Sequence, residues 1–289
     1  MKTVKRVVGI TALVILAVSA CIAQAPQEKS VAVFGAKINY VEAGDPAKPT
    51  VLLLHGLGSS VASSWMFTIA PLSANFHVIA LDQVGFGKSD KPLLKYRVAT
   101  YVDFLDKFMS ELKIDKASLV GNSLGGWVAA LMAIKYPTRV EKIVLADAAG
   151  LKPSDVDLKL IYSLNYSTRD EVRDLVKRVF FNQTLVSSDA FIDQSMNLRL
   201  AAGDGYTINS LIESIKRDED FLNGRLGEIK KPALVIWGKQ DGLLKVTDGE
   251  QMKREIPGAE LIVFDQCGHV PQVEKAADFN KAVMAFLAK

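Results

Sequence analysis

The sequence predicts an α/β protein with a mostly parallel central sheet and a helical segment inserted before the last two strands. Three observations lead to this prediction. Short apolar runs rich in β-branched residues recur along the chain without the alternation of a half-solvated strand. Helical patterns separate several of these runs. From about residue 151 to residue 231 only helical patterns occur.

The predicted strands are six near-continuous apolar runs. A parallel strand covered by helices on both faces has no polar side, which explains the absence of alternation. Residues 30–45 differ, because they alternate around Gly35 and so predict a two-stranded antiparallel start. The six runs are Thr50–Gly56, His77–Asp82, Ala117–Ser123, Lys142–Ala148, Pro232–Gly238 and Glu260–Gln266.

Helices are predicted by apolar residues at steps of three and four. One covers residues 98–112, another runs from Leu124 until Pro137 stops it, and a third covers residues 276–289. We therefore divide the chain into a core of residues 26–150 and 232–289 and a helical cap of residues 151–231. A cap beyond the strand ends would cover the edge where open α/β sheets bind ligands. Its helical patterns are 157–166, 169–181, 189–202 and 206–222.

The first 20 residues have the layout of an export signal. A basic start precedes an apolar run, residues 7–20, which is shorter than the ~20 residues of a membrane-spanning helix. Val18-Ser19-Ala20-Cys21 resembles a bacterial lipobox, in which Cys21 is lipidated and tethers the protein to a membrane surface. Cleavage after Ala23 or Ala25 and an uncleaved anchor are the alternatives. We expect an exported protein of the bacterial cell envelope, lipid-anchored or secreted.

Charge and cysteine content exclude several classes. Removing residues 1–20 takes away three basic residues and no acidic one. The remaining 32 of the 35 basic residues equal the 32 acidic residues in number, so the formal charges balance. No basic run remains to bind nucleic acid. Only Cys21 and Cys267 exist, so we expect neither a stabilising disulfide in the lipidated protein nor a structural zinc site.

Ser123 is the candidate nucleophile. Gly121-Asn122-Ser123-Leu124-Gly125 fits G-x-S-x-G, and it follows a predicted strand and opens a predicted helix. A tight strand-to-helix turn strains the serine backbone, and glycines on either side prevent clashes. The alternative is a helix-capping serine in a glycine turn.

A nucleophilic serine needs a base, and a histidine base needs a carboxylate. Of the three histidines, His269 follows the last predicted strand and is the best base. Asp241 follows the strand Pro232–Gly238 and is the favoured acid member, with Asp147 as its competitor. Asp265 is placed within the last strand. The order Ser, Asp, His is that of α/β-hydrolases.

The loop His55–Ser60, HGLGSS, follows the first core strand. Its glycines would let the backbone N–H of Leu57 point at a developing oxyanion, with the N–H of Leu124 as second donor. The alternative is a plain strand-ending turn. GFGKSD (Gly85–Asp90) suggests a nucleotide-binding loop, but position 82 is Asp where that motif needs glycine. We expect Asp82 and Ser89 to make local hydrogen bonds there, and we expect no cofactor and no metal.

Taken together, these motifs resemble the α/β-hydrolase fold enzymes. HGLG, DQVGFGKSD, GNSLGG, YPTRV, WGKQDGLL and CGHVPQVEKA occur in the family's order between Val51 and the C-terminus. The sequence around WGKQD and CGH is most similar to that of monoacylglycerol lipases, bacterial lipases and carboxylesterases. The resemblance implies that Ser123, Asp241 and His269 are nucleophile, acid member and base. Serine at position 123 argues against the dehalogenase and epoxide hydrolase branches, which use a carboxylate.

The main hypothesis is a serine esterase or lipase that cleaves acyl esters through an acyl-enzyme on Ser123. A C–C bond hydrolase or a lactonase would use the same three residues, so the sequence leaves these open. A non-enzymatic ligand-binding receptor on the same fold is the third hypothesis. The apolar cap sequences LIYSLNY and VFF are candidates for an acyl pocket or for plain helix packing.

Overall fold

A computed structural model describes residues 25–152, 161, 163–186 and 188–289. The predicted export signal and Cys21 lie outside these residues. Within the described ranges, no helix combines the length and the apolar character needed to cross a bilayer.

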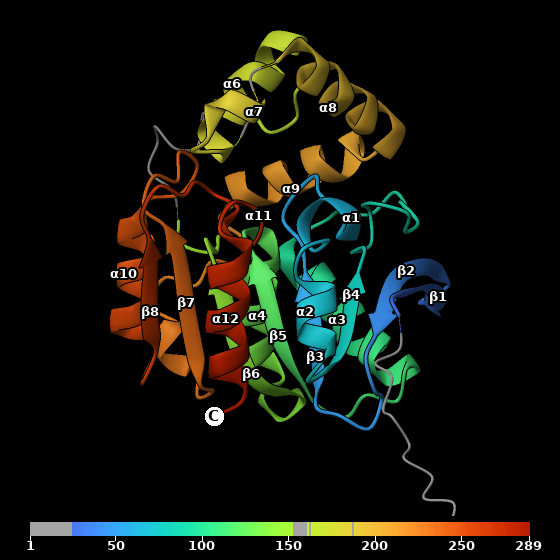
Figure 1. Ribbon diagram of the computed structural model, residues 1–289. Helices are drawn as coiled ribbons and strands as arrows, with labels where there is room; N and C mark the ends of the chain where they lie inside the picture. The colour runs from blue at the N-terminus through green and yellow to red at the C-terminus, as the bar shows by residue number, and fades with distance from the viewer. Residues whose placement is uncertain (1–24, 153–160, 162, 187) are drawn as a thin grey trace, which may run out of the picture.

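The core is one eight-stranded sheet that is mostly parallel, as predicted (Figure 1). β3 to β8 pair in parallel, and β1 and β2 add an antiparallel edge. The spatial order is β1-β2-β4-β3-β5-β6-β7-β8. The strands are β1 (Gln27–Val33), β2 (Ala36–Ala43), β3 (Thr50–Leu54), β4 (His77–Leu81), β5 (Ala117–Asn122), β6 (Val140–Ala146), β7 (Ala233–Gly238) and β8 (Glu260–Phe264).

The antiparallel start is a hairpin with a two-residue turn. Val33 pairs with Ala36, and the two residues between them, Phe34 and Gly35, have φ values of 50° and 82°. Two consecutive left-handed residues give the turn the twist that a two-residue hairpin needs. The predicted antiparallel pair around Gly35 is confirmed.

Helices cover both faces of the sheet. The helices outside the cap are α1 (Val61–Ser64), α2 (Ile69–Ser73), α3 (Val98–Glu111), α4 (Leu124–Lys135), α10 (Val246–Glu255), α11 (Pro271–Glu274) and α12 (Ala276–Leu287), with the short 3₁₀ turn η1 (Pro137–Arg139); a second 3₁₀ turn, η2 (Leu226–Glu228), lies between α9 and β7.

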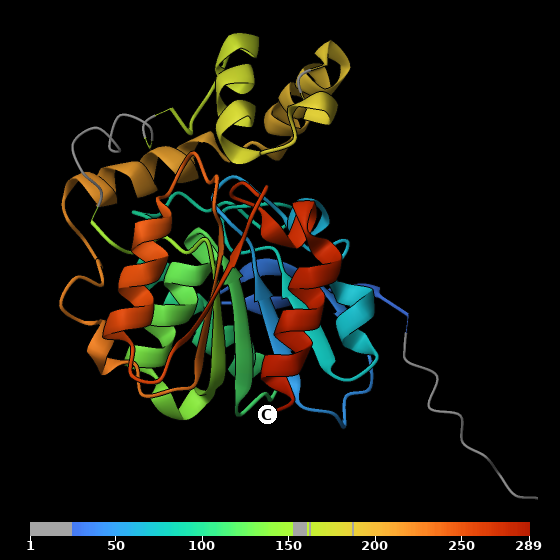
Figure 2. The same ribbon diagram turned by 60° about the vertical axis from the view of Figure 1, so that its left-hand side comes forward.

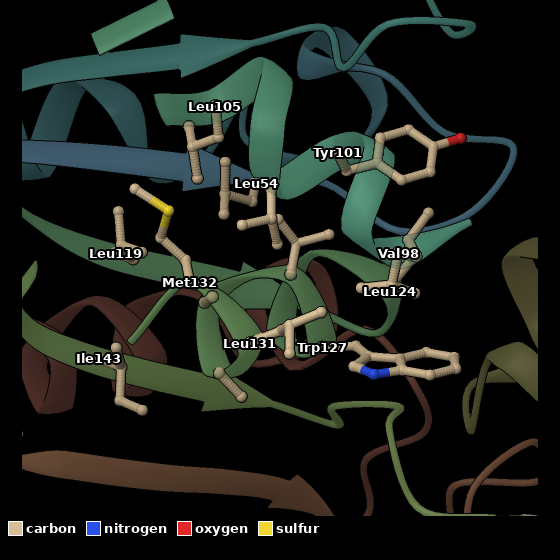
Figure 3. Packing of buried hydrophobic residues seen from close by; sticks show 14 of the residues in the cluster. Leu54, Val98, Tyr101, Leu105, Leu119, Leu124, Trp127, Leu131, Met132 and Ile143 are labelled. Atoms are coloured by element: carbon tan, nitrogen blue, oxygen red, sulfur yellow. The ribbon is translucent and has the colours of Figure 1, made fainter. Parts of the chain in front are cut away.

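Successive residues of β3 point to opposite faces. Leu52 and Leu54 pack in the cluster that contains α3, α4 and α10, whereas Val51 and Leu53 pack in the cluster that contains α1, α2 and α12. Burial on both faces explains why this strand is apolar throughout. Figure 3 shows the first cluster, in which Leu54 lies among side chains of α3 and α4.

The cap segment between β6 and β7 contains α6 (Arg169–Val179), α7 (Gln183–Val186), α8 (Asp189–Ala202) and α9 (Gly205–Lys216). α9 crosses directly above the carboxyl ends of the strands, and α6, α7 and α8 form a further layer (Figures 1 and 2). The buried residues of α9 join the main core cluster, whereas Val172, Val176, Val186 and Ile192 form a small cluster of their own. The predicted helix 157–166 lies partly outside the described residues.

Gly125 is required because α4 starts against the backbone of β3. A Cβ atom at this position would lie 2.1 Å from the carbonyl oxygen of Leu54. We predict that Gly125→Ala lowers the free energy of unfolding by about 1–3 kcal/mol in urea denaturation, because the clash outweighs the ~1 kcal/mol gain in helix propensity. Gly227→Ala is the control, since its nearest atom would be 3.9 Å away. Equal stability of the two variants would contradict this packing.

Candidate active site

Four polar side chains follow four adjacent parallel strands and meet at one edge of the sheet. Ser123 follows β5, Asp147 follows β6, Asp241 follows β7 and His269 follows β8. Because the carboxyl ends of parallel strands share an edge, residues far apart in the chain converge there. α9 lies over this edge (Figure 1).

Ser123 occupies a strained turn between β5 and α4. Its φ of 54° and ψ of −117° are unfavourable for a residue with a side chain. The turn is held because Ser123 N donates to Ala146 O at 3.0 Å, while Ser123 O accepts from the amides of Gly126, Trp127 and Ala149. A Cβ at Gly121 would lie 2.2 Å from Gly125 O, so the flanking glycine is needed too. This geometry is that of a nucleophile elbow.

His269 is paired with Asp241. The distance from His269 Nδ1 to Asp241 Oδ2 is 2.7 Å, and the side chains are 7% and 0% exposed. Asp241 Oδ1 accepts from the amides of Leu243 and Leu244 at 2.8 and 3.1 Å, which fixes the carboxylate. Since Nδ1 faces Asp241, Nε2 is the ring nitrogen that can exchange a proton with a hydroxyl. Ser123 and His269 line the same pocket.

The other two carboxylates considered are placed differently. Asp147 is fully buried beside Asp241, but the ring nitrogen of His269 bonds to Asp241. Asp265 does not lie in the last strand as expected, because β8 ends at Phe264. Its side chain is 66% exposed and contacts Lys239 and Gln240, so it faces solvent.

The loop after β3 lies against the serine. A Cβ at Gly56 would be 3.3 Å from Ser123 Cβ, and Leu57 lines the pocket together with Leu124. Leu124 is the first residue of α4, where the amide precedes the intrahelical hydrogen bonds. Both predicted oxyanion donors therefore belong to residues that border the cavity containing Ser123.

His55 shapes this loop and is not a base. It is fully buried, and its burial lowers the pKa of the imidazole. Nε2 accepts from the amide of Gln83 at 3.0 Å, so the proton lies on Nδ1, which donates to Gly56 O at 2.8 Å. The Gln83 side chain donates in turn to His55 O at 2.8 Å.

The GFGKSD turn supports the same region. Ser89 Oγ donates to Asp82 O at 2.5 Å, and the Asp82 carboxylate accepts from the amides of Val61 and Lys88. The predicted local hydrogen bonds of Asp82 and Ser89 are confirmed. His77 lies on β4, where its Nε2 lies 2.6 Å from a carboxylate oxygen of Glu42.

The described residues that line the pocket are apolar apart from Ser123 and His269. The pocket and its open mouth together span about 680 Å³. Trp127 and Phe221 stack on one wall with ring centroids 5.0 Å apart. Of the two cap sequences proposed for an acyl pocket, LIYSLNY lines the pocket through Ile161 and Leu164. The cap helix α9 also lines it, through Leu211 and Ile215. The described lining residues include no lysine, arginine, aspartate or glutamate.

The end of α6 is attached to the loops that carry Asp241 and His269, a role that the sequence did not reveal. His269 N donates to Val179 O at 2.7 Å, and Gly242 N donates to Arg178 O at 3.0 Å. The sequence VFF therefore contributes a backbone carbonyl that holds the candidate base.

Glu274 makes the second attachment between cap and core. One carboxylate oxygen accepts from Gly268 N at 2.7 Å, and the other accepts from the amides of Phe181 and Asn182 at 2.9 and 3.0 Å. Asn122 fixes the same loop from below, because its side chain donates to His269 O at 3.1 Å. In the sequence, only the position of Glu274 at the end of CGHVPQVE, shortly after His269, points to this role.

Asp147, Asp241 and His269 are also the one group of described side chains close enough to share a metal ion, with one ligand atom from each within 4.8 Å of the others. His269 and Asp241 already face each other at hydrogen-bonding distance. This contact leaves no space for an ion between them, so we assign the group to hydrogen bonding.

Known proteins share both the sequence pattern and the architecture. The family described as alpha/beta hydrolase fold matches residues 49–276. The 2-hydroxy-6-oxononadienedioate/2-hydroxy-6-oxononatrienedioate hydrolase of Paraburkholderia xenovorans is 34% identical over 269 residues, which cover 87% of this chain and 91% of that protein.

Two further proteins extend the range of activities. The dihydrolipoyllysine-residue acetyltransferase component of the acetoin cleaving system of Cupriavidus necator is 33% identical over 251 residues, 85% of this chain, although the chain spans only 65% of that protein. The crystal structure of a membrane phospholipase A, a bacterial virulence factor, superimposes with a TM-score of 0.80 at 31% identity, covering 91% of this chain and 86% of that one.

The attachment through Glu274 can be tested without a substrate. We predict that Glu274→Gln speeds amide hydrogen exchange at Gly268 and Phe181 and lowers the free energy of unfolding by about 1.5–3 kcal/mol, since three amides lose a charged acceptor. The exposed Glu250 lies on α10, away from this contact, and Glu250→Gln is the matched control. Unchanged exchange at Gly268 in the Glu274 variant would refute the role.

Proposed function

Since this chain belongs to the α/β-hydrolase fold family, we propose that it is a serine hydrolase with Ser123 as nucleophile, His269 as base and Asp241 as acid member. One observation carries the proposal. Ser123 and His269 line one pocket, and the ring nitrogen of His269 on the other side is held by Asp241 at 2.7 Å. This is the relation that a serine, its base and the orienting carboxylate require.

In the proposed reaction, His269 Nε2 takes the proton of Ser123 while Ser123 Oγ attacks the substrate carbonyl. The oxygen of that carbonyl becomes negative and accepts from the amides of Leu57 and Leu124, donors of a kind worth about 3–4 kcal/mol each. His269 then protonates the leaving group. Water, activated by the same histidine, releases the acid from Ser123.

The apolar lining supports a carboxylic ester with an uncharged acyl group as the substrate. A carboxylate buried in this pocket would lose its hydration and find no lysine or arginine among the described lining residues. An alkyl or aryl acyl chain instead gains about 25 cal/mol for each Å² that it buries. The similarity to a membrane phospholipase A supports an acylglycerol-like ester.

A C–C bond hydrolase, or a lactonase with the same three residues, is the second candidate, and the Paraburkholderia relative favours it. The compound in that protein's name has a ketone and no ester, so its hydrolysis breaks a carbon–carbon bond. It is also a dioate with two carboxylates, for which the described pocket residues here offer no cation. The relative therefore supports cleavage of a carbon–carbon bond, whereas the apolar pocket lining supports an uncharged substrate.

We predict that a fluorophosphonate probe labels Ser123 and that Ser123→Ala abolishes both labelling and p-nitrophenyl ester turnover while the fold is retained. A non-enzymatic receptor would not react with the probe. A panel of neutral esters of graded chain length, a lactone and a 6-oxo-dienoate distinguishes the two candidate reactions. Faster turnover of the dienoate than of every ester would replace the ester proposal with carbon–carbon cleavage.

We also propose that the protein is exported and that Cys21 carries a lipid, a proposal that rests on residues 1–21 of the sequence. Expression in a bacterium with labelled palmitate tests it. We expect label on the wild type and none on Cys21→Ser, and a mature mass that lacks residues 1–20. An unlabelled chain that starts at residue 24 or 26 would indicate ordinary cleavage, and a full-length mass would contradict export by cleavage.

A further inference from the structure

Asp147 is a buried carboxyl group for which the proposed reaction has no use. Its side chain is 0% exposed, and its backbone has a φ of 42°, which is costly for a residue other than glycine. Burial of a charged group without a partner is costlier still. The hydrogen bonds around Asp147 therefore have to account for its presence.

Asp147 is attached to β7 by two hydrogen bonds. Its amide donates to Ile236 O at 2.9 Å, and its Oδ1 accepts from Gly238 N at 2.8 Å. The other carboxyl oxygen, Oδ2, is buried and has no hydrogen-bond partner among the described groups.

A carboxyl oxygen of Asp147, a carboxyl oxygen of Asp241 and a ring nitrogen of His269 lie within 4.8 Å of one another. Asp241 already accepts from Leu243 N, Leu244 N and His269 Nδ1, so its two oxygens act as acceptors. Two ionised carboxylates would repel at this distance, and neither has a proton to donate. A proton on Asp147 Oδ2 removes the repulsion and gives the unpartnered oxygen a bond.

The electrostatic surroundings agree with this arrangement. Burial, followed by the charge of Asp241, raises the pKa of Asp147 well above its usual range. Glu274 from α11 acts in the same direction, and the Cys267 thiol and the His269 ring also lie nearby.

We propose that Asp147 is a positioning residue that stays protonated and donates a hydrogen bond to Asp241, holding this carboxylate against His269. The inference rests on the proposed function, because it treats Asp241 and His269 as the catalytic pair. The neutral acid adds a donor without adding a second negative charge. Asp241 is thereby held from β6 as well as from its own loop while His269 gains and loses a proton.

Substitution of Asp147 by asparagine or by leucine shows whether the residue acts as a hydrogen-bond donor or as a negative charge. Asp147→Asn keeps an oxygen for Gly238 N and offers an N–H to Asp241, whereas Asp147→Leu has neither group. We expect kcat for ester turnover to fall about tenfold to a hundredfold in Asp147→Leu and to recover at least tenfold in Asp147→Asn. If Asp147→Leu does not fold, Asp147→Asn decides alone. A loss of more than tenfold in Asp147→Asn would show that a negative charge is needed and would overturn the proposal.

A second measurement needs no substrate, so it separates failure of this inference from failure of the proposed hydrolysis. Asp147 ionises in the unfolded chain above about pH 4 but keeps its proton in the fold, so unfolding releases one proton. We expect the ratio of the unfolding equilibrium constants, wild type over Asp147→Asn, to rise by up to about tenfold per pH unit from pH 5 to 7. A ratio that is constant over this range would mean that Asp147 is ionised in the fold, and the proposal would be wrong.

Discussion

The candidate site depends on the strained turn at Ser123. A left-handed serine is tolerated there because β6 and α4 bond its backbone on both sides and because Gly121 and Gly125 leave room for the close approach of strand and helix. The turn brings Ser123 to the pocket that the loops after β3 and β8 also line, through Leu57 and His269.

The cap is part of the frame that holds the histidine. His269 is fixed by Asp241 at the ring, by Asn122 at its carbonyl and by Val179 of α6 at its amide. The other end of the cap has a different task, since α9 and Phe221 supply apolar pocket wall. This one insertion therefore both holds His269 through α6 and lines the pocket through α9.

The strands and the three candidate residues could be predicted from the sequence because each rests on local rules. The parallel strands are largely apolar, and Ser123, Asp241 and His269 each follow one of them. The end of β8 was placed two residues too late, because the strand ends at Phe264 and the side chain of Asp265 faces solvent. The role of Glu274 could not be predicted, because its partners at Gly268 and Phe181 come together only in the fold. The sequence identified Asp147 as the competitor of Asp241. Only the structure shows that the ring nitrogen of His269 bonds to Asp241.

We propose that residues 123, 241 and 269 act on one substrate carbonyl beside the amides of residues 57 and 124. A crystal structure of the protein inactivated by a small fluorophosphonate would test this arrangement. We expect phosphorus bonded to Ser123 Oγ, its phosphoryl oxygen within hydrogen-bonding distance of Leu57 N and Leu124 N, and His269 Nε2 beside Ser123 Oγ. An adduct on another residue, or a phosphoryl oxygen directed away from both amides, would contradict it.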